Sequence, residues 1–363
     1  MYDVITLGSA AVDAFAETDA ELHKFRHNFR GQKSHKDLFE KMLCYHLGSK
    51  LLINHLGFMT GGGGTNTAAC FSKLGLKAAY LGNIGDDENG RKVLEELAKF
   101  HVRFIGTKDK KHMTNYSIIL DSRAKDRTIL AYKGASDHFG LKDISKKQLD
   151  AKLDAKWLYF SSLTGKSFWT AERLAEYVKG GDCRKNRAGK DAGKSSNIKI
   201  AFNPSSYQAK MGAKFLRRML SCTDVLILNS EEAALVAGIH KTDENKNAGA
   251  IRILAEKLRS LGPKIVVITD GSKGAYCSDG IHFYFAKTTD VKAVETTGAG
   301  DCFASSFITG LIRKKDIEFA LKLATANAES CIRHFGAKNG LLTWGSAIRR
   351  MKKDRIKAIK QKI

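Results

Sequence analysis

Short uninterrupted apolar runs recur along the chain, and amphipathic stretches follow several of them. Apolar runs without polar alternation are typical of strands buried on both faces of a parallel sheet, whereas an apolar residue every three or four positions indicates a helix. The pattern therefore predicts an α/β fold with a doubly wound, mostly parallel central sheet flanked by helices. The predicted strands are residues 4–7, 78–81, 157–160, 198–202, 225–228 and 265–269, and the clearest helices are residues 87–100 and 302–312.

Two segments do not follow this alternation of apolar strands and amphipathic helices. The first, about residues 14–60, contains a pattern that predicts a helix around residues 36–45 and a strand around residues 51–56. The second, about residues 115–132, reads as the two strands of a hairpin. Because both segments begin or end beside the edge of the predicted sheet, we predict that they form a small β-rich lid that covers a bound substrate.

The composition fits one large domain with a short tail. The chain has 363 residues, of which 43% are hydrophobic and only 2 are proline, which excludes a disordered or collagen-like chain. We assign residues 1–345 to a single domain, in which the small, polar and basic residues 180–197 form a surface loop. Residues 346–363 place isolated apolar residues among basic ones and are predicted to form a basic C-terminal helix.

The sequence gives no sign of a membrane or of an oxidising compartment. No apolar run approaches the length of about 20 residues that a membrane-spanning helix needs, and the N-terminus lacks the pattern of a secretion signal. The 7 cysteines are scattered singly without a C-x-x-C pair, which is typical of reduced thiols. We therefore expect a cytoplasmic protein with no membrane partner.

Lysine and arginine outnumber the acidic residues by 61 to 38, which gives a net charge of +23. Such a charge favours anionic partners, namely nucleotides, phosphorylated products or nucleic acid. The excess lies mainly in residues 184–199 and 349–362, where no aromatic residues are interleaved to stack on single strands. A solvated surface is therefore favoured. The alternative, a non-catalytic nucleic-acid-associated basic protein, predicts salt-sensitive binding without catalysis.

The candidate catalytic motif is the sequence ETTGAGD at residues 295–301. Phe303, Phe307 and Leu311 recur at four-residue spacing, which predicts a helix that begins at the glycines. The start of a helix presents unpaired N–H groups and the positive end of the helix dipole, so it can bind a negatively charged oxygen. Asp301 beside this anion site could deprotonate a hydroxyl that attacks a phosphoryl group. A helix with packing glycines and an acidic cap is the simpler alternative.

Further polar residues lie near the ends of predicted strands, which is where open α/β sheets bind ligands. Asp13 could accept hydrogen bonds from two neighbouring sugar hydroxyls. The glycine run at residues 61–64 lets the backbone approach a ligand, and Asn66 offers an amide donor and acceptor. Asn229 and Glu232 are one helical turn apart, a spacing suited to Mg²⁺ or phosphate. Taken alone, each could also be a cap or turn residue.

Two signatures resemble those of a known family. The sequence GGGGTNTAACFSKLG at residues 61–75 resembles the N-terminal signature of the PfkB (ribokinase-like) carbohydrate and nucleoside kinases, and ETTGAGD at residues 295–301 resembles their C-terminal signature. The resemblance covers about residues 2–345 and implies a ribokinase-like sheet with a small β-rich lid. The blocks between the signatures also look like those of the family, at residues 85–90, 203–204, 229–232 and 267–274.

The resemblance implies a role for individual residues. It makes Asp301 the general base, with the N–H groups of Gly298, Ala299 and Gly300 as the anion hole. The residues that would hold the acceptor are Asp13, Gly62, Gly63 and Asn66. The residues that would line the ATP site are Asn203, Asn229, Thr269, Gly271, Gly274, Asn327 and Gly336. Glu232 would lie near Mg²⁺ and contact it through water.

The implied activity is that of an ATP- and Mg²⁺-dependent kinase that phosphorylates a hydroxymethyl group of a sugar. A nucleoside kinase similar to adenosine kinases is the alternative within the family, because the predicted lid segment is longer than in plain ribokinases. The family usually has aspartate where this chain has Glu295, which bears on a monovalent-cation site carried by the neighbouring loop. Family members often pair through their lids, so a homodimer is expected.

Overall fold

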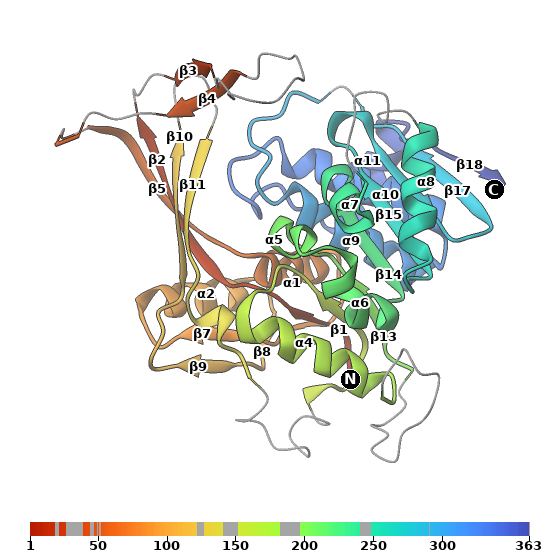
Figure 1. The fold of residues 1–363 in the computed structure, drawn as a ribbon, viewed down its shortest axis with the longest axis horizontal. Helices are drawn as coiled ribbons and strands as arrows, with labels where there is room; N and C mark the ends of the chain where they lie inside the picture. Colours follow the sequence, from red (N-terminus) through yellow and green to blue (C-terminus); the bar gives the residue numbers. More distant parts are fainter. Residues whose placement is uncertain are drawn as a thin grey trace, which may run out of the picture.

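A central sheet of ten strands carries helices on both faces, and a smaller sheet stands away from it (Figure 1). The computed structural model describes residues 1–18, 22–26, 39–43, 47–48, 50, 52–121, 127–140, 152–181, 197–239, 248–289 and 291–362. The predicted basic loop at residues 180–197 lies almost wholly outside these ranges.

The central sheet contains every strand that the apolar runs predict. Its parallel strands are, in spatial order, β8 (Arg103–Phe104), β6 (Ala78–Tyr80), β1 (Tyr2–Leu7), β12 (Ala155–Phe160), β13 (Lys199–Phe202), β14 (Val225–Asn229) and β15 (Ile265–Thr269). The antiparallel strands that complete the sheet beyond β15 are β16 (Ala275–Ser278), β17 (His282–Ala286) and β18 (Ala358–Lys362). The prediction of a mostly parallel central sheet is therefore confirmed.

Side chains alternate between the two faces of the central sheet and build two cores. In β1, Ile5 and Leu7 belong to one core, whereas Val4 belongs to the other. The helices over the first core are α4 (Gly165–Val178), α6 (Gly212–Cys222), α7 (Ser230–Ala237) and α8 (Ala248–Arg259). The helices over the second core are α1 (Gly63–Lys73), α2 (Glu88–Lys99), α9 (Ala299–Lys314) and α10 (Ile317–Cys331). Burial on both faces explains the uninterrupted apolar strands.

The smaller sheet is the predicted lid. Its strands are, in spatial order, β11 (Arg127–Tyr132), β10 (Asn115–Asp121), β2 (Ala11–Thr18) and β5 (Ile53–Gly61). Strands β10 and β11 form the predicted hairpin, and β10 lies parallel to β2. The register pairs Asp13 of β2 with Met59 and with Ser117, so these three side chains share one face of the lid.

The prediction of a helix around residues 36–45 is wrong. Phe39–Leu43 forms strand β4, which pairs with β3 (Leu22–Arg26) in an antiparallel ladder. A short segment reads equally well as helix or strand, and the ladder provides hydrogen-bond partners for the backbone groups of both segments. Pairing with a distant segment therefore overrides the local pattern.

The predicted C-terminal helix over residues 346–363 is correct only in its first part. Helix α11 (Trp344–Lys353) ends before Arg355, whose φ of 47° lies in the left-handed region. The following strand, β18, pairs antiparallel with β17 along the edge of the central sheet. The sequence AIKQK at residues 358–362 suits a strand, and the available edge of β17 provides its partner.

The described cysteines agree only in part with the expectation of reduced thiols. Cys70, Cys277, Cys302 and Cys331 are free and buried. Cys222 is disulfide-bonded. None of the described helices is long and apolar enough to cross a membrane.

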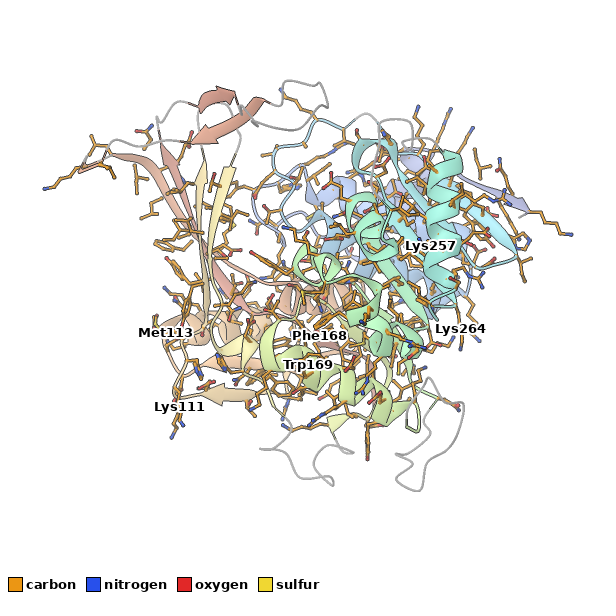
Figure 2. All side chains as sticks on the ribbon, in the orientation of Figure 1. Lys111, Met113, Phe168, Trp169, Lys257 and Lys264 are labelled. Atoms are coloured by element: carbon orange, nitrogen blue, oxygen red, sulfur yellow. The ribbon has the colours of Figure 1, made fainter. Side chains whose placement is uncertain are left out.

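Three lysines of the described surface lie on different elements (Figure 2). Lys111 follows β9 (Thr107–Asp109), Lys257 lies on α8 and Lys264 precedes β15, and all three are exposed. The Nζ of Lys264 lies 2.8 Å from a carboxylate oxygen of Asp224. Residues 182–196, which carry part of the basic excess, lie outside the described residues.

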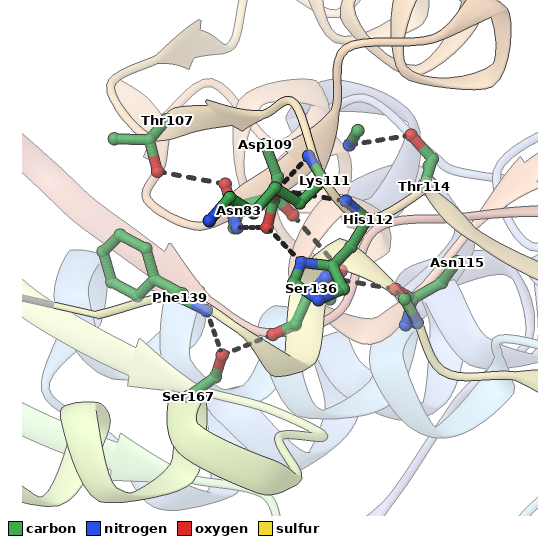
Figure 3. Close-up of polar contacts among 12 residues, drawn as sticks. Asn83, Thr107, Asp109, Lys111, His112, Thr114, Asn115, Ser136, Phe139 and Ser167 are labelled. Carbon is green, nitrogen blue, oxygen red and sulfur yellow. Dashed lines mark hydrogen bonds and ion pairs between the residues drawn. The ribbon is translucent and has the colours of Figure 1, made fainter.

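Polar side chains anchor the base of the lid hairpin to the main domain (Figure 3). Asn115, the first residue of β10, accepts hydrogen bonds from the N–H groups of Gly134 at 3.0 Å and Ser136 at 3.1 Å. The hydroxyl of Ser167, on α4, donates to the carbonyl oxygen of Ser136 at 2.5 Å. The hairpin is therefore linked to α4 through the short 3₁₀ helix η1 (Ala135–Asp137).

Asp109, the last residue of β9, accepts several hydrogen bonds in the same region (Figure 3). It accepts from the side chain of Asn83, in β7 (Asn83–Gly85), at 3.0 Å and from the N–H groups of Lys111 and His112 at 2.8 and 3.1 Å. The Nδ1 of His112 lies 2.9 Å from Asp109 Oδ2. Burial alone would raise the pKa of Asp109, but the bonds from His112 and Lys111 outweigh burial and lower the pKa to about 2.

We expect Asp109→Asn to lower the free energy of unfolding at pH 7 by about 1–3 kcal/mol, because an amide nitrogen cannot accept from the donors that face the carboxylate. A carboxylate with a depressed pKa stabilises the fold above its unfolded-state pKa of about 3.9 and loses this contribution as the pH falls through about 2. The difference from wild type should therefore shrink between about pH 4 and about pH 2.

Chemical unfolding at several pH values measures this difference. Asp86→Asn is the control, because Asp86 is exposed and its ion pair with Lys108 is long, at 3.5 Å. A difference between Asp109→Asn and wild type that stays constant down to about pH 2 would contradict the assigned charge.

Candidate active site

Helix α9 begins at the ETTGAGD motif, as the sequence predicts. Gly298 is its N-cap with a φ of 78°, and a Cβ atom on Gly298 would lie 2.3 Å from the Cβ of Ala337. Both observations require glycine at this position. Asp301 lies in the first turn, where helix N–H groups lack intrahelical acceptors and the helix dipole is positive. The helix start can therefore hold an anion next to a carboxylate.

The start of α1 lies against the start of α9. The side-chain amide of Asn66 donates to Asp301 Oδ2 at 2.9 Å. A Cβ atom on Gly63 would lie 1.9 Å from Ser161 Oγ and 3.4 Å from Asp301 Oδ1. The backbone of α1 can approach this closely only because residue 63 has no side chain. Segments from three distant parts of the sequence thus meet at Asp301.

The surroundings of Asp301 make it a stronger base than an exposed carboxylate. Burial raises the pKa of Asp301, and the hydrogen bond from Asn66 and the charge of Lys338 oppose this effect only in part. The Oδ1 atom of Asn66 is buried and has no hydrogen-bond partner among the described residues. It can therefore accept a hydrogen bond from a ligand hydroxyl held beside Asp301.

Asp13 faces the same region from the lid. A Cβ atom on Gly61 would lie 2.1 Å from Asp13 Oδ2, and one on Gly62, whose φ is 96°, would lie 2.4 Å from the carbonyl oxygen of Ser9. Burial raises the pKa of Asp13, and the hydroxyl of Ser117 opposes this shift. The glycine run thus lets Asp13 lie against the backbone, and the predicted acceptor-side residues gather where the lid meets the central sheet.

Two adjoining cavities lie at the carboxyl ends of the parallel strands. The central cavity, of about 290 Å³, is lined by Asn203, Asn229, Glu232, Thr269, Gly298, Gly300 and Asp301, among others. The side cavity, of about 330 Å³, is lined by Thr269, Gly271, Gly274, Ala299, Gly300, Phe303, Thr325 and Ala328, among others. Because Thr269 and Gly300 line both cavities, one extended ligand can occupy the two.

Hydrogen bonds fix the polar residues of the central cavity. Asn229 caps α7 and accepts from the N–H groups of Glu231 and Glu232 at 3.0 and 2.8 Å. Glu232 in return accepts from the Asn229 N–H at 3.1 Å and from Ser206 Oγ at 3.0 Å. Burial raises the pKa of Glu232, and the negative charges of Glu231 and Asp301 add to this shift. A cation in the cavity would stabilise the ionised form of Glu232.

Asn327, predicted to line the ATP site, lies in the interior instead. It is fully buried in α10, where its amide nitrogen donates to Ser306 Oγ at 2.8 Å and its oxygen accepts from the Leu342 N–H at 2.8 Å. A buried amide needs such partners, and they join α9, α10 and the segment before α11. Thr325 and Ala328 are the neighbours on α10 that line the side cavity.

Gly336 also lies outside the two cavities. Its N–H donates to Glu295 Oε2 at 2.8 Å, and a Cβ atom on Gly336, whose φ is 87°, would lie 2.2 Å from the Sδ of Met59. Gly336 therefore contacts both the ETTGAGD motif and lid strand β5. The N–H of Ala299, predicted as part of the anion hole, donates to the Thr296 carbonyl oxygen at 3.2 Å, and Ala299 lines the side cavity.

Sequence reasoning missed three residues of the site. Ser161 and Ser162 line the central cavity and directly follow the apolar run of β12, so their place at a strand end could have identified them. Lys338 acts on Asp301 by its charge but stands alone in the sequence. No pattern could have distinguished it from the other lysines.

A hydroxyl held between Asn66 and Asp301 would lie at the start of α9, where a phosphoryl group can bind. This arrangement is that of a kinase, a phosphotransferase with an alcohol group as acceptor. The chain belongs to the pfkB family carbohydrate kinases, whose model matches residues 41–344.

Known relatives agree with this assignment. A ribokinase of Haemophilus influenzae is 26% identical over 288 residues, which cover 78% of this chain and 84% of the relative. The structure of Arabidopsis thaliana ribokinase complexed with ribose and ATP has a TM-score of 0.73 at 19% identity, with 97% of this chain and 99% of that chain covered. A nucleoside kinase of Methanocaldococcus jannaschii has a TM-score of 0.69 at 17% identity, with 97% and 99% covered. These structures confirm the ribokinase-like fold.

We expect Gly63→Ala to lower kcat/KM roughly 10- to 100-fold, because the added methyl would lie 1.9 Å from Ser161 Oγ and would push α1 away from Asp301. Steady-state phosphorylation measures the change. Gly345→Ala, near the start of α11, is the matched control, because its Cβ would have no neighbour closer than 3.6 Å. Wild-type activity in Gly63→Ala would mean that this close approach has no part in catalysis.

Proposed function

We propose that the protein transfers the γ-phosphoryl group of ATP to a hydroxymethyl group of a free sugar, as a ribokinase does, with Asp301 as the general base. The observation that carries this proposal is the 2.9 Å hydrogen bond from Asn66 to Asp301 at the start of α9. This bond orients the carboxylate beside the helix N–H groups. The base can then act on the acceptor hydroxyl while the N–H groups bind the γ-phosphoryl group that the hydroxyl attacks.

On the acceptor side, Asp13 and Asn66 would bind sugar hydroxyls, and the bare backbone at Gly62 and Gly63 would let the sugar approach. The hydroxymethyl proton would pass to Asp301 as the oxygen attacks the γ-phosphorus. The raised pKa of Asp301 supports this role, because a stronger base removes the proton more readily. The helix N–H groups at Gly298 and Gly300 would stabilise the charge that develops.

On the donor side, the base of ATP would occupy the side cavity and its phosphates the central cavity. The predicted residues that line these cavities support this placement, namely Asn203, Asn229, Thr269, Gly271 and Gly274. Thr269 and Gly300, which line both cavities, would lie beside the ligand where it passes from one to the other.

Glu232 is the residue that would hold Mg²⁺, and the ion would neutralise phosphate charge. No group of three or more histidine, cysteine, aspartate or glutamate residues within the described ranges could hold a metal directly. Both carboxylate oxygens of Glu232 accept hydrogen bonds from the protein, so contact through water fits this residue better than direct coordination.

A monovalent cation beside Glu295 is a further expectation of the family resemblance. The carboxylate of Glu295 accepts the Gly336 N–H at 2.8 Å and thereby fixes the loop next to the anion site. A cation at this loop would contact the same carboxylate of Glu295. The assay of the proposed activity is therefore run with and without K⁺.

Phosphorylation of a nucleoside is the second candidate, and one observation favours it. Phe335 is 37% exposed and its ring centroid lies 4.7 Å from that of Phe15, on the lid face that carries Asp13. An exposed aromatic ring beside the acceptor site could stack on a nucleobase. Phe58 of β5 pairs with Ala14 and therefore lies on the opposite face of the lid, so it is not part of such a surface.

A panel of pentoses, hexoses and nucleosides, assayed with ATP and Mg²⁺ and with or without K⁺, tests the proposal. We expect a free sugar to be the best acceptor, judged by kcat/KM. A strong preference for one nucleoside over every free sugar would reverse the order of the two candidates. Absence of phosphorylation with the whole panel would contradict both.

We expect Asp301→Asn to retain nucleotide binding and to lower turnover by roughly 100-fold or more, because the variant keeps the shape of the side chain and loses the base. Nucleotide binding is measured by calorimetry and turnover by product formation with the preferred acceptor. Near-wild-type turnover in Asp301→Asn would remove Asp301 as the base.

We also propose that two copies pair through the outer face of the lid, defined as the face opposite Asp13. Alternation along the strands places a set of exposed apolar side chains on this face, namely Leu56, Phe58, Ile118, Leu130 and Tyr132. In β5, Phe58 is 56% exposed, and its row continues across the sheet to Ile118 and Leu130. Apolar side chains gathered in this way mark an interaction surface.

We expect wild type to be a dimer and Leu130→Glu to be a monomer at micromolar concentration, because a charge on this face would be desolvated on pairing. Size-exclusion chromatography with light scattering measures the mass. Ile253→Glu, at a position of α8 that is 65% exposed, is the control and should stay dimeric. A monomeric wild type would contradict the proposal.

A further inference from the structure

Lys338 is buried where the lid, α2 and the start of α9 meet. Only 7% of the residue is exposed. Its Nζ donates to the carbonyl oxygen and to the Oγ1 of Thr60, both at 2.7 Å, and also to Glu96 Oε2. Thr60 belongs to lid strand β5 and Glu96 to α2. One ammonium group therefore holds the base of the lid against α2.

The residues just before Lys338 contact the site on both sides. A Cβ atom on Gly298, the N-cap of α9, would lie 2.3 Å from the Cβ of Ala337. A Cβ atom on Gly336 would lie 2.2 Å from the Sδ of Met59, in β5. The segment that carries Lys338 is therefore packed between the anion-binding helix start and the lid.

The charge of Lys338 acts on the two carboxylates of the site. It opposes the rise that burial causes in the pKa of Asp301 and of Asp13. Burial lowers the pKa of Lys338 itself, and the charges of Glu96, Asp13 and Asp301 oppose that shift. A buried ammonium is costly, and an apolar side chain could replace it if packing alone were needed. The ammonium group does more than fill space, because it bonds Thr60 and Glu96 and its charge acts on Asp13 and Asp301.

We propose that Lys338 is a positioning residue, which seats the lid against α2 and supplies the positive charge that Asp13 and Asp301 face. The inference rests on the proposed function of Asp301 as the base and goes beyond it. It assigns to one side chain both the placement of the lid and the ionisation of the carboxylates beneath it.

Other titratable groups face these residues and remain unchanged in the test. The groups are Glu232, Tyr159 and Cys70 near Asp301, Lys133 and Glu295 near Asp13, and Lys92, Glu95 and Lys99 in a cavity of about 380 Å³ next to Lys338. These groups carry charges of both signs and also affect the pH profile. The test therefore keeps them constant and compares variants only at position 338.

The test measures kcat/KM of Lys338→Met and Lys338→Arg between about pH 5.5 and about pH 9, with ATP, Mg²⁺ and the acceptor preferred in the panel. Without the positive charge, burial should raise the pKa of Asp301 further, so the acidic limb of the profile should move to higher pH. We expect Lys338→Met to lose about 10-fold or more toward the acidic end of this range and to recover most of this loss toward its alkaline end. Lys338→Arg keeps the positive charge, so the acidic limb of its pH profile should lie at the same pH as in wild type.

Lys99→Met is the matched control, because Lys99 lines the same cavity and is exposed. It should leave the profile unchanged. If Lys338→Met does not fold, Lys338→Gln, which can still donate to Thr60, gives the same comparison. A loss that is equal at every pH would mean a purely structural role and would overturn the inference.

Asp301→Asn separates this inference from the proposed function. If Asp301→Asn keeps near-wild-type turnover, Asp301 is not the base and both fail. If Asp301→Asn is inactive while the uncharged variants at position 338 keep the acidic limb of wild type, only the inference on Lys338 fails.

Discussion

The hydrogen bond from Asn66 to Asp301 joins two helix starts that lie 235 positions apart in the sequence. Each helix can come this close only because it begins with glycine: Gly63 leaves room for Ser161, and Gly298 leaves room for Ala337. The same contact buries the carboxylate, and burial raises its pKa. Orientation and basicity of the carboxylate thus have one structural cause, the close packing of α1 on α9.

This packing concentrates negative charge. Asp13, Glu232 and Asp301 all have raised pKa values, chiefly because of burial, and Asp301 adds to the shift of Glu232. Lys338 is the cation whose charge opposes the shift at both Asp13 and Asp301. A polyphosphate would bring further negative charge into the central cavity, so its binding should require a cation near Glu232. The dependence on Mg²⁺ that we propose follows from this charge balance.

The local sequence predicted the parts of the structure that depend on local patterns. Apolar runs identified the parallel strands, and the two signatures located the helix starts that carry Asn66 and Asp301. Strand β4 and strand β18 were missed because each depends on a partner strand elsewhere in the chain. Asn327 and Gly336 were assigned to the ATP site by position in the family pattern, but their partners are Leu342 and Glu295. Such contacts are set by tertiary packing, which neither spacing nor composition encodes.

The register of β2 on β5 gives the lid two chemically different faces. Pairing of Asp13 with Met59 puts both on the face that we propose binds the acceptor, and pairing of Ala14 with Phe58 puts the next row on the outer face. A slip of one residue would exchange the faces and would turn Asp13 away from the proposed acceptor site. The glycines before α1 and the bonds from Lys338 to Thr60 fix this register at the base of the lid. The proposed acceptor site and the proposed dimer surface therefore depend on the same few contacts.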